Sequence, residues 1–234
     1  MKFKKLWVIV LAGIMTFGMT ATASAKADAS WNAGKGTATI DGVKDDSYAT
    51  GQQMDMDAVS DGTADGTVAD AWAIYDDTAV YFFVEVADSS LDDTNANVWE
   101  KDSVEFRTNK GTLMQAFAVD ESFTGTVASE VKVLKTDKGY NVEFKVPYTA
   151  KEGESMKFSL QVNAASGGKR NCTLHTNEDL KDAWQNDDVF ENLVFSTESA
   201  AAAPKTGVVS FGLIFAAGAI GSAAGAKICR RKEK

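Results

Sequence analysis

Histidine and cysteine are scarce in this sequence of 234 residues, and each scarcity argues against a class of chemistry. His175 is the only histidine, so histidine-based zinc sites, haem attachment through a Cys-x-x-Cys-His motif and Ser-His-Asp catalysis have little support. The two cysteines, Cys172 and Cys229, provide no disulfide framework, because the apolar segment described below would place them on opposite sides of a membrane. Cys172 alternates with Leu174 and is predicted to be a small buried side chain.

Positive charge is also scarce between Lys26 and Thr206. This part of the chain has 16 lysine and arginine residues against 32 aspartate and glutamate residues, a net charge of −16. Such a surface repels a phosphate backbone, so no nucleic acid partner is expected. The acidity suits solubility at a crowded surface and can supply oxygen ligands for cations.

Helix signals are nearly absent, because no amphipathic stretch of several turns occurs. Instead, about nine short stretches alternate apolar and polar residues between turn signals, which predicts an all-β fold, an antiparallel, jelly-roll-like β-sandwich over residues 26–195. Residues Lys26 to Lys35 are interpreted as a polar lead-in and Thr37 to Ile40 as a short extended run. The clearest strands are Val68 to Tyr75, Ala79 to Ala87, Glu130 to Lys135, Tyr140 to Val146 and Met156 to Asn163.

Both ends of the chain are predicted to carry targeting signals. Residues 1–25 are predicted to be a signal peptide, with a basic start (Lys2, Lys4, Lys5), an apolar run (Leu6 to Met19) and the cleavage site Ala23-Ser24-Ala25. Residues 208–226 are apolar and long enough to form a transmembrane helix, and a basic tail follows them (Lys227, Arg230, Arg231, Lys232). The tail is expected in the cytoplasm and the domain outside the cell.

The segment before the apolar run contains Ala203, Pro204, Lys205, Thr206 and Gly207. This motif, followed by an apolar segment and a basic tail, resembles the cell-wall sorting signal of Gram-positive bacteria, here residues 204–234. The resemblance implies cleavage by a sortase between Thr206 and Gly207, attachment to cell wall peptidoglycan, and a location at the cell surface. Residues 196–203 would then be a linker. The alternative is a plain single-span membrane anchor.

The stretch Asn97 to Phe106 combines an exposed aromatic ring with a carboxylate on a strand. Trp99 has polar neighbours, and from Asp102 onward the residues alternate, so that Glu105 shares the polar face of a strand. Trp184 lies in a second polar loop, and Gln161 lies on the polar face of another strand. Flat aromatic faces and a few fixed polar groups are what a sugar-binding site requires. The alternative is that both tryptophans cap the sandwich while Glu105 pairs with a cation such as Lys101.

Several motifs together resemble the family 9 carbohydrate-binding modules over Thr37 to Phe195. They are Ile-Asp-Gly at 40–42, Ala-Trp-Ala-Ile-Tyr-Asp-Asp at 71–77, Val-Trp-Glu-Lys-Asp-Ser-Val-Glu at 98–105, Gln-Val-Asn at 161–163, Trp184 and a closing Phe-x-x-Leu. The resemblance implies a β-sandwich, commonly stabilised by calcium, that holds the end of a glucan or xylan chain between two tryptophans.

By this resemblance, Trp99 and Trp184 would stack on the sugar, and Glu105 and Gln161 would bind its hydroxyl groups. The sequence departs from the family at two positions, which appear here as Ala118 in place of an arginine and Lys181 in place of an asparagine. Loss of a bidentate donor would weaken or alter binding. Three other cations are candidates to replace that donor: Lys181, Arg107 and Arg170.

Carboxylates near the same strand suggest a structural calcium ion. Asp88, Asp92, Asp93 and Asp102 offer the hard oxygen ligands that calcium requires. The alternative is an acidic loop that is simply solvated.

The leading hypothesis is therefore a non-catalytic carbohydrate-binding module at the cell surface, with a polysaccharide or oligosaccharide as its partner. A haem- or redox-binding surface protein of a related sandwich fold is a second hypothesis, based on Met54, Met56, Met114 and His175. A protein-binding adhesin is a third. A glycosidase that pairs Glu105 with Asp102 is disfavoured, because residues an odd number of positions apart on a strand point to opposite faces.

Overall fold

The computed structural model describes residues 30–108 and 113–198, which form an almost entirely β structure. The strands are β1 (Ser30–Lys35), β2 (Met54–Met56), β3 (Ala58–Gly62), β4 (Val68–Tyr75), β5 (Ala79–Ala87), β6 (Ser103–Thr108), β7 (Leu113–Phe117), β8 (Phe123–Gly125), β9 (Glu130–Lys135), β10 (Gly139–Pro147), β11 (Ser155–Ser166), β12 (Lys169–His175) and β13 (Glu191–Ser196). Short 3-10 helices are η1 (Asp46–Thr50), η2 (Val98–Glu100), η3 (Glu178–Asp182) and η4 (Asp187–Val189).

The predicted targeting signals fall outside these two ranges. The expected signal peptide, most of the linker and the sorting signal with its apolar segment are not among the described residues. Within the described ranges, no helix has the length and apolar character needed to cross a membrane.

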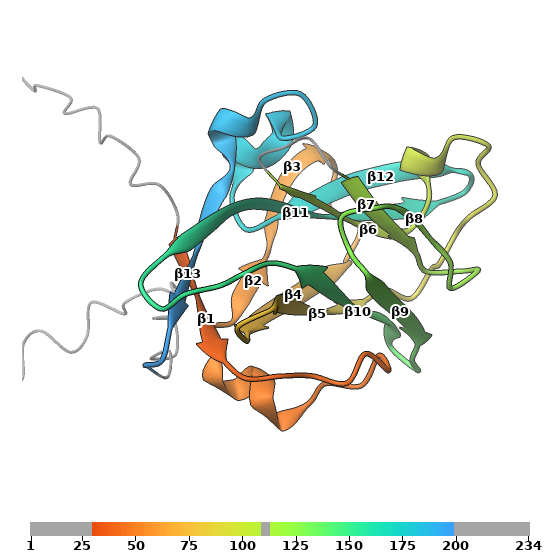
Figure 1. The fold of residues 1–234 in the computed structure, drawn as a ribbon. Coiled ribbons are helices and arrows are strands. Elements are labelled where there is room, and N and C mark those ends of the chain that lie inside the picture. Colours follow the sequence, from red (N-terminus) through yellow and green to blue (C-terminus); the bar gives the residue numbers. More distant parts are fainter. Residues whose placement is uncertain (1–29, 109–112, 199–234) are drawn as a thin grey trace, which may run out of the picture.

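The strands form one continuous sheet that folds over on itself into two facing layers (Figure 1). Its order is β8-β7-β6-β11-β13-β1-β4-β5-β10-β9, with β12 beside β11 and β3, and β2 beside β4. β13 and β1 lie in the middle of this order and join the layer of β6, β7, β11 and β12 to the layer of β4, β5 and β10. The result is a near-barrel form of β-sandwich whose path ends at β8 and β9.

The main core fills the space between the two layers. Phe82 of β5 and Phe144 of β10 stack with ring centroids 5.0 Å apart, and Phe106 of β6 meets Phe82 at 4.8 Å from the opposite layer. Aromatic pairs at these separations add to the stabilisation from burial alone. Phe106 and Val104 lie in this core, as their alternation along the strand predicts.

The antiparallel prediction is wrong at one place, the strand that joins the two layers. β1 runs parallel to both β13 and β4, so the sheet is mixed. Its residues were interpreted as a polar lead-in, yet Ala33 is fully buried and Gly34 packs so closely on Thr50 that a Cβ would lie 2.3 Å from its backbone. This contact requires a glycine, and a glycine weakens the strand pattern in the sequence. The next run, Thr37 to Ile40, was expected to be extended but forms no strand.

A smaller core lies on the outer face of β4 and β5. Residues 36–50 cover this face, and Tyr48 packs there against Phe83 with ring centroids 5.6 Å apart. Trp72 of β4 is buried in the same cluster. The buried carboxylate of Glu143 contacts the covering segment: it accepts hydrogen bonds from the backbone N–H groups of Asp41 and Gly42 and from the hydroxyl of Tyr48.

Candidate functional site

The floor of the candidate site is built by cross-strand rows of polar side chains. Gln161 of β11, Glu105 of β6 and Gln115 of β7 lie opposite one another on adjacent strands. Because side chains alternate between the faces of a strand, these three point away from the core on the same side of the sheet. In the neighbouring row, Asn163 of β11 lies between Ser103 and Thr173.

Hydrogen bonds hold this floor in one arrangement. The Nδ2 of Asn163 donates to Glu105 Oε1 at 2.8 Å and to Ser103 Oγ at 3.0 Å, while its Oδ1 accepts from Gln161 Nε2 at 2.6 Å. Glu105 also forms an ion pair with Arg107. The cation beside Glu105 is therefore Arg107 and not Lys101, and the carboxylate is a preorganised acceptor.

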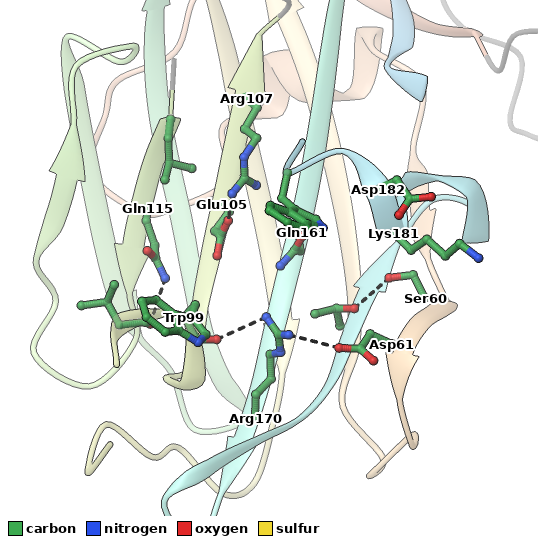
Figure 2. A pocket seen from close by; sticks show the side chains of 14 residues that line it. Ser60, Asp61, Trp99, Glu105, Arg107, Gln115, Gln161, Arg170, Lys181 and Asp182 are labelled. Carbon is green, nitrogen blue, oxygen red and sulfur yellow. Dashed lines mark hydrogen bonds and ion pairs between the residues drawn. The ribbon is translucent and has the colours of Figure 1, made fainter. Parts of the chain in front are cut away.

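A pocket of about 650 Å³ opens above this floor (Figure 2). Its volume lies within the range of small-molecule binding sites. The lining residues are Ser60, Asp61, Val98, Trp99, Glu105, Arg107, Leu113, Gln115, Gln161, Arg170, Thr173, Lys181, Asp182 and Trp184.

Two of the lining residues are exposed tryptophans from different segments. Trp99 lies in η2 with 51% of its surface exposed, and Trp184 follows η3 with 66% exposed. The two indoles give one pocket two large exposed apolar faces, and exposed apolar surface gathered in this way marks ligand-binding grooves. The segment that bears Trp184 has its own small core of Leu180, Ala183 and Phe190.

All six residues predicted to bind a ligand line this one pocket: Trp99, Glu105, Gln161, Trp184, Lys181 and Arg170. These six residues come from β6, β11, β12 and two loops, which are far apart in the chain. The prediction missed Gln115 and Asp61, and it noted Arg107 only as an alternative. The alternation of Gln115 with Met114 and Ala116, which lie in the core, was available as a signal for Gln115. Asp61 lies in β3, whose pairing with β12 is a long-range contact.

Ala118 does not mark a gap in the pocket. It is fully buried in the main core and is not a lining residue. The arginines that line the pocket, Arg107 and Arg170, come from β6 and β12. Each is paired with a carboxylate, Glu105 and Asp61 respectively, so the charges of both arginines are balanced within the pocket wall.

The residues proposed for calcium lie close together, but hydrogen bonds occupy most of their oxygens. Asp102 accepts from the backbone N–H groups of Asp92 and Ala165, and Asp92 accepts from Gly168 and Thr94. Among the oxygens of these aspartates, Asp88 Oδ2 is buried without a hydrogen-bond partner.

No group of three or more acidic, histidine or cysteine side chains among residues 30–108 and 113–198 is arranged to hold a metal ion. Asp88, Asp92 and Asp102 therefore do not form such a group in this structure. Burial of Asp102 instead raises the pKa of its carboxyl group to about 8. Calcium stays a prediction of the family resemblance.

The residues on which the haem hypothesis rests are all buried. Met54, Met56 and Met114 are fully buried in the main core. His175 is 1% exposed, and its Nδ1 lies 2.9 Å from the carbonyl oxygen of Leu160. None of the four lines the pocket. Asp102 is not a lining residue either, whereas Glu105 is, in agreement with the prediction that their side chains diverge.

His175 gives a prediction about acid stability. Burial lowers its pKa from 6.5 to about 4, so its contribution to folding is complete above pH 6.5 and is lost as the pH falls through 4. Between pH 8 and pH 5, this residue should lower the free energy of unfolding by about 2 kcal/mol.

Urea unfolding of the wild type and of His175→Gln at pH 8 and pH 5 measures this contribution. The comparison must be made between the two proteins, because Asp102, with its raised pKa, stabilises the fold as the pH falls from 8 toward 4. The His175→Gln protein should lose less stability on acidification. An identical pH dependence in both proteins would rule the explanation out.

Exposed aromatic rings over a rigid polar floor are typical of sites that bind small polar molecules. Residues 40–112 match the model of the family described as "Carbohydrate family 9 binding domain-like". The chain is 29% identical over 184 residues to the exoglucanase XynX of Acetivibrio thermocellus, a match that covers 69% of this chain and 16% of that protein. It is 28% identical over 189 residues to the endo-1,4-beta-xylanase A of Thermoanaerobacterium saccharolyticum, covering 73% and 16%. The chain thus spans about a sixth of the length of these relatives.

Two solved structures share the fold. Both are family 9 carbohydrate-binding modules from Caldicellulosiruptor kristjanssonii, one in complex with cellotriose and one with glucose. Each superposes with a TM-score of 0.64; they are 24% and 23% identical, and each covers 75% of this chain and 98% or 100% of the module. Together, these comparisons support the fold of a family 9 carbohydrate-binding module for the described residues.

Proposed function

We propose that this chain is a non-catalytic carbohydrate-binding module of the family 9 type, which holds the end of a glucan or xylan chain between Trp99 and Trp184. The observation that carries the proposal is the pocket in which these two exposed indoles stand above the polar floor of Glu105 and Gln161. The apolar C–H face of a pyranose ring suits an indole, and its hydroxyl groups suit fixed acceptors and donors.

The floor offers complementary groups for a pair of neighbouring hydroxyls. Glu105 is an acceptor fixed by Asn163 and Arg107, and the Oε1 of Gln161 provides a second acceptor, because its Nε2 already donates to Asn163. Arg107 supplies donors beside them. A site with such buried, preorganised partners discriminates strongly against ligands that lack the matching hydroxyl.

Binding without catalysis is supported by the contacts of Glu105 and by the position of Asp102. Glu105 is engaged by a cation and an amide, and the nearby Asp102 lies in the interior, away from the pocket. The relatives are named as glucanases and xylanases, but the match covers only about a sixth of their length. The proposal therefore concerns the shared module and no hydrolytic activity.

Display on a Gram-positive cell wall completes the proposal. The support is the sequence alone: the predicted signal peptide and the segment from Pro204 to Gly207 before an apolar run and a basic tail. A sortase would join Thr206 to peptidoglycan. Release of the protein by digestion of the wall of the producing cell tests this part, and extraction by detergent alone would indicate the single-span membrane anchor instead.

Calorimetric titration with glucose, cellotriose and xylotriose tests the binding function. A saturable signal with one site per chain is expected for at least one of these sugars. Phe123→Ala is a matched control, because Phe123 is an exposed aromatic residue of β8 that does not line the pocket, and it should bind like the wild type. Absence of heat with every sugar, from a protein shown to be folded, would overturn the proposal.

A further inference from the structure

We infer that Arg170 is a positioning residue, which fixes the Trp99 wall of the pocket and joins it to the floor. This inference rests on the proposed function of the pocket. The guanidinium of Arg170 contacts three separate elements, and Figure 2 shows its contacts with Trp99 and Asp61. Its Nη1 donates to the carbonyl oxygen of Trp99 in η2 and to Asn163 Oδ1 in β11, both at 3.3 Å, and its Nη2 lies 3.1 Å from Asp61 Oδ2 in β3.

The backbone of Arg170 is attached to the same wall. Its N–H donates to Glu100 Oε2 at 2.8 Å, so side chain and backbone together hold the two consecutive residues Trp99 and Glu100. A three-residue 3-10 helix such as η2 has little stability of its own, because it forms few internal hydrogen bonds. The orientation of Trp99 must therefore come from contacts outside η2.

Further contacts attach the other end of the Trp99 segment, defined here as residues 92–100. The N–H of Gly168, in the turn between β11 and β12, donates to Asp92 Oδ2 at 2.7 Å. The Nδ2 of Asn95 donates to the carbonyl oxygen of the same glycine. The β11–β12 hairpin thus holds the Trp99 segment at both ends, and Arg170 is the contact nearest to the indole.

Arg170 also joins the wall to the floor. The Oδ1 of Asn163 accepts from both Arg170 and Gln161, and its Nδ2 donates to Glu105. One short chain of hydrogen bonds therefore links the carbonyl of Trp99 to the two residues proposed to bind sugar hydroxyls. Trp184, by contrast, lies on residues 176–190, which have a separate small core.

The consequence is preorganisation of one wall before the sugar arrives. Fixing a side chain in its bound position removes an entropy cost that binding would otherwise carry. Nη1 and Nη2 of Arg170 already donate to Trp99 O, Asn163 Oδ1 and the charged Asp61 Oδ2. Arg170 therefore acts on affinity through Trp99 and not as a direct sugar ligand.

A double-mutant cycle separates these two roles. Arg170→Met should weaken the binding of cellotriose about fivefold to tenfold in the wild type, and less than about twofold in the Trp99→Ala protein, because the residue to be positioned is then absent. Arg170→Lys should be intermediate, since a lysine keeps the charge but loses the planar fork. NMR titration covers the weak affinities of the double variant.

Lys169→Met is the matched control, because it removes an exposed cation next to Arg170 that does not line the pocket. It should bind like the wild type. Equal losses from Arg170→Met with and without Trp99 would show direct contact with the sugar and overturn the inference.

A second readout needs no sugar. In the ligand-free protein, the order parameter of the Trp99 indole N–H should fall from about 0.85 to below about 0.6 in Arg170→Met, with that of Trp72 unchanged as a control for folding. An unchanged Trp99 order parameter would overturn the inference even if all sugars bind. If no sugar binds the wild type while the order parameter falls, the proposed function fails and the positioning role stands.

Discussion

Replacing Glu143 by alanine is expected to lower the free energy of unfolding by about 3–5 kcal/mol. Glu143 is fully buried in β10, and its carboxylate accepts from Asp41 N–H at 3.0 Å, Gly42 N–H at 2.9 Å and Tyr48 Oη at 3.0 Å. The substitution leaves three donors without their partner and detaches residues 36–50 from the small core. A loss of this size is a large fraction of the stability of an ordinary domain.

Two variants show whether these hydrogen bonds are the cause. Glu143→Gln keeps a side-chain oxygen that can accept from the backbone N–H groups of Asp41 and Gly42, so it should lose much less stability than the alanine variant. Glu130→Ala removes an exposed glutamate that pairs with Lys145 on the neighbouring strand, and it should cost less than about 1 kcal/mol. Urea unfolding measures all three. A loss below about 1 kcal/mol for Glu143→Ala would mean that this carboxylate does not hold the segment.

Replacement of either exposed tryptophan is expected to weaken sugar binding about 30- to 100-fold. Trp99 and Trp184 supply the two large apolar faces of the pocket, and aromatic residues of this kind carry a large share of the binding energy at recognition sites. Calorimetric titration of Trp99→Ala and Trp184→Ala with cellotriose measures the loss.

The conservative variants Trp99→Phe and Trp184→Phe serve as controls for this prediction. They keep a flat ring and should lose less than about tenfold in affinity. Thermal unfolding should change little in all four proteins, since both side chains are mostly exposed. Alanine variants that bind within twofold of the wild type would exclude the stacking role.

Local alternation predicted much of the fold because many strands here have one face in a core. The ranges Val68–Tyr75, Ala79–Ala87 and Glu130–Lys135 agree with β4, β5 and β9. Strands without that signal were missed. β1 contains Gly34 and few apolar residues, and its place between β13 and β4 depends on contacts with residues about 40 to 160 positions away.

Part of the pocket was also predicted from the alternation of polar and apolar residues along strands. Glu105 and Gln161 lie on the polar faces of strong strands, so the sequence alone identified them, and the register then placed them opposite each other. The contribution of Asp61 depends on the pairing of β3 with β12, which no local pattern reveals. The contacts of Arg170 were equally hidden, because they join η2, β11 and β3 across the fold.

The most direct test of the account is an NMR titration with cellotriose that follows the indole N–H signals. The described residues contain four tryptophans, of which Trp99 and Trp184 line the pocket and Trp31 and Trp72 do not. The account predicts that the signals of Trp99 and Trp184 shift together and saturate at one sugar per chain, while those of Trp31 and Trp72 stay in place. Unmoved signals from Trp99 and Trp184, in a protein that binds the sugar, would contradict it.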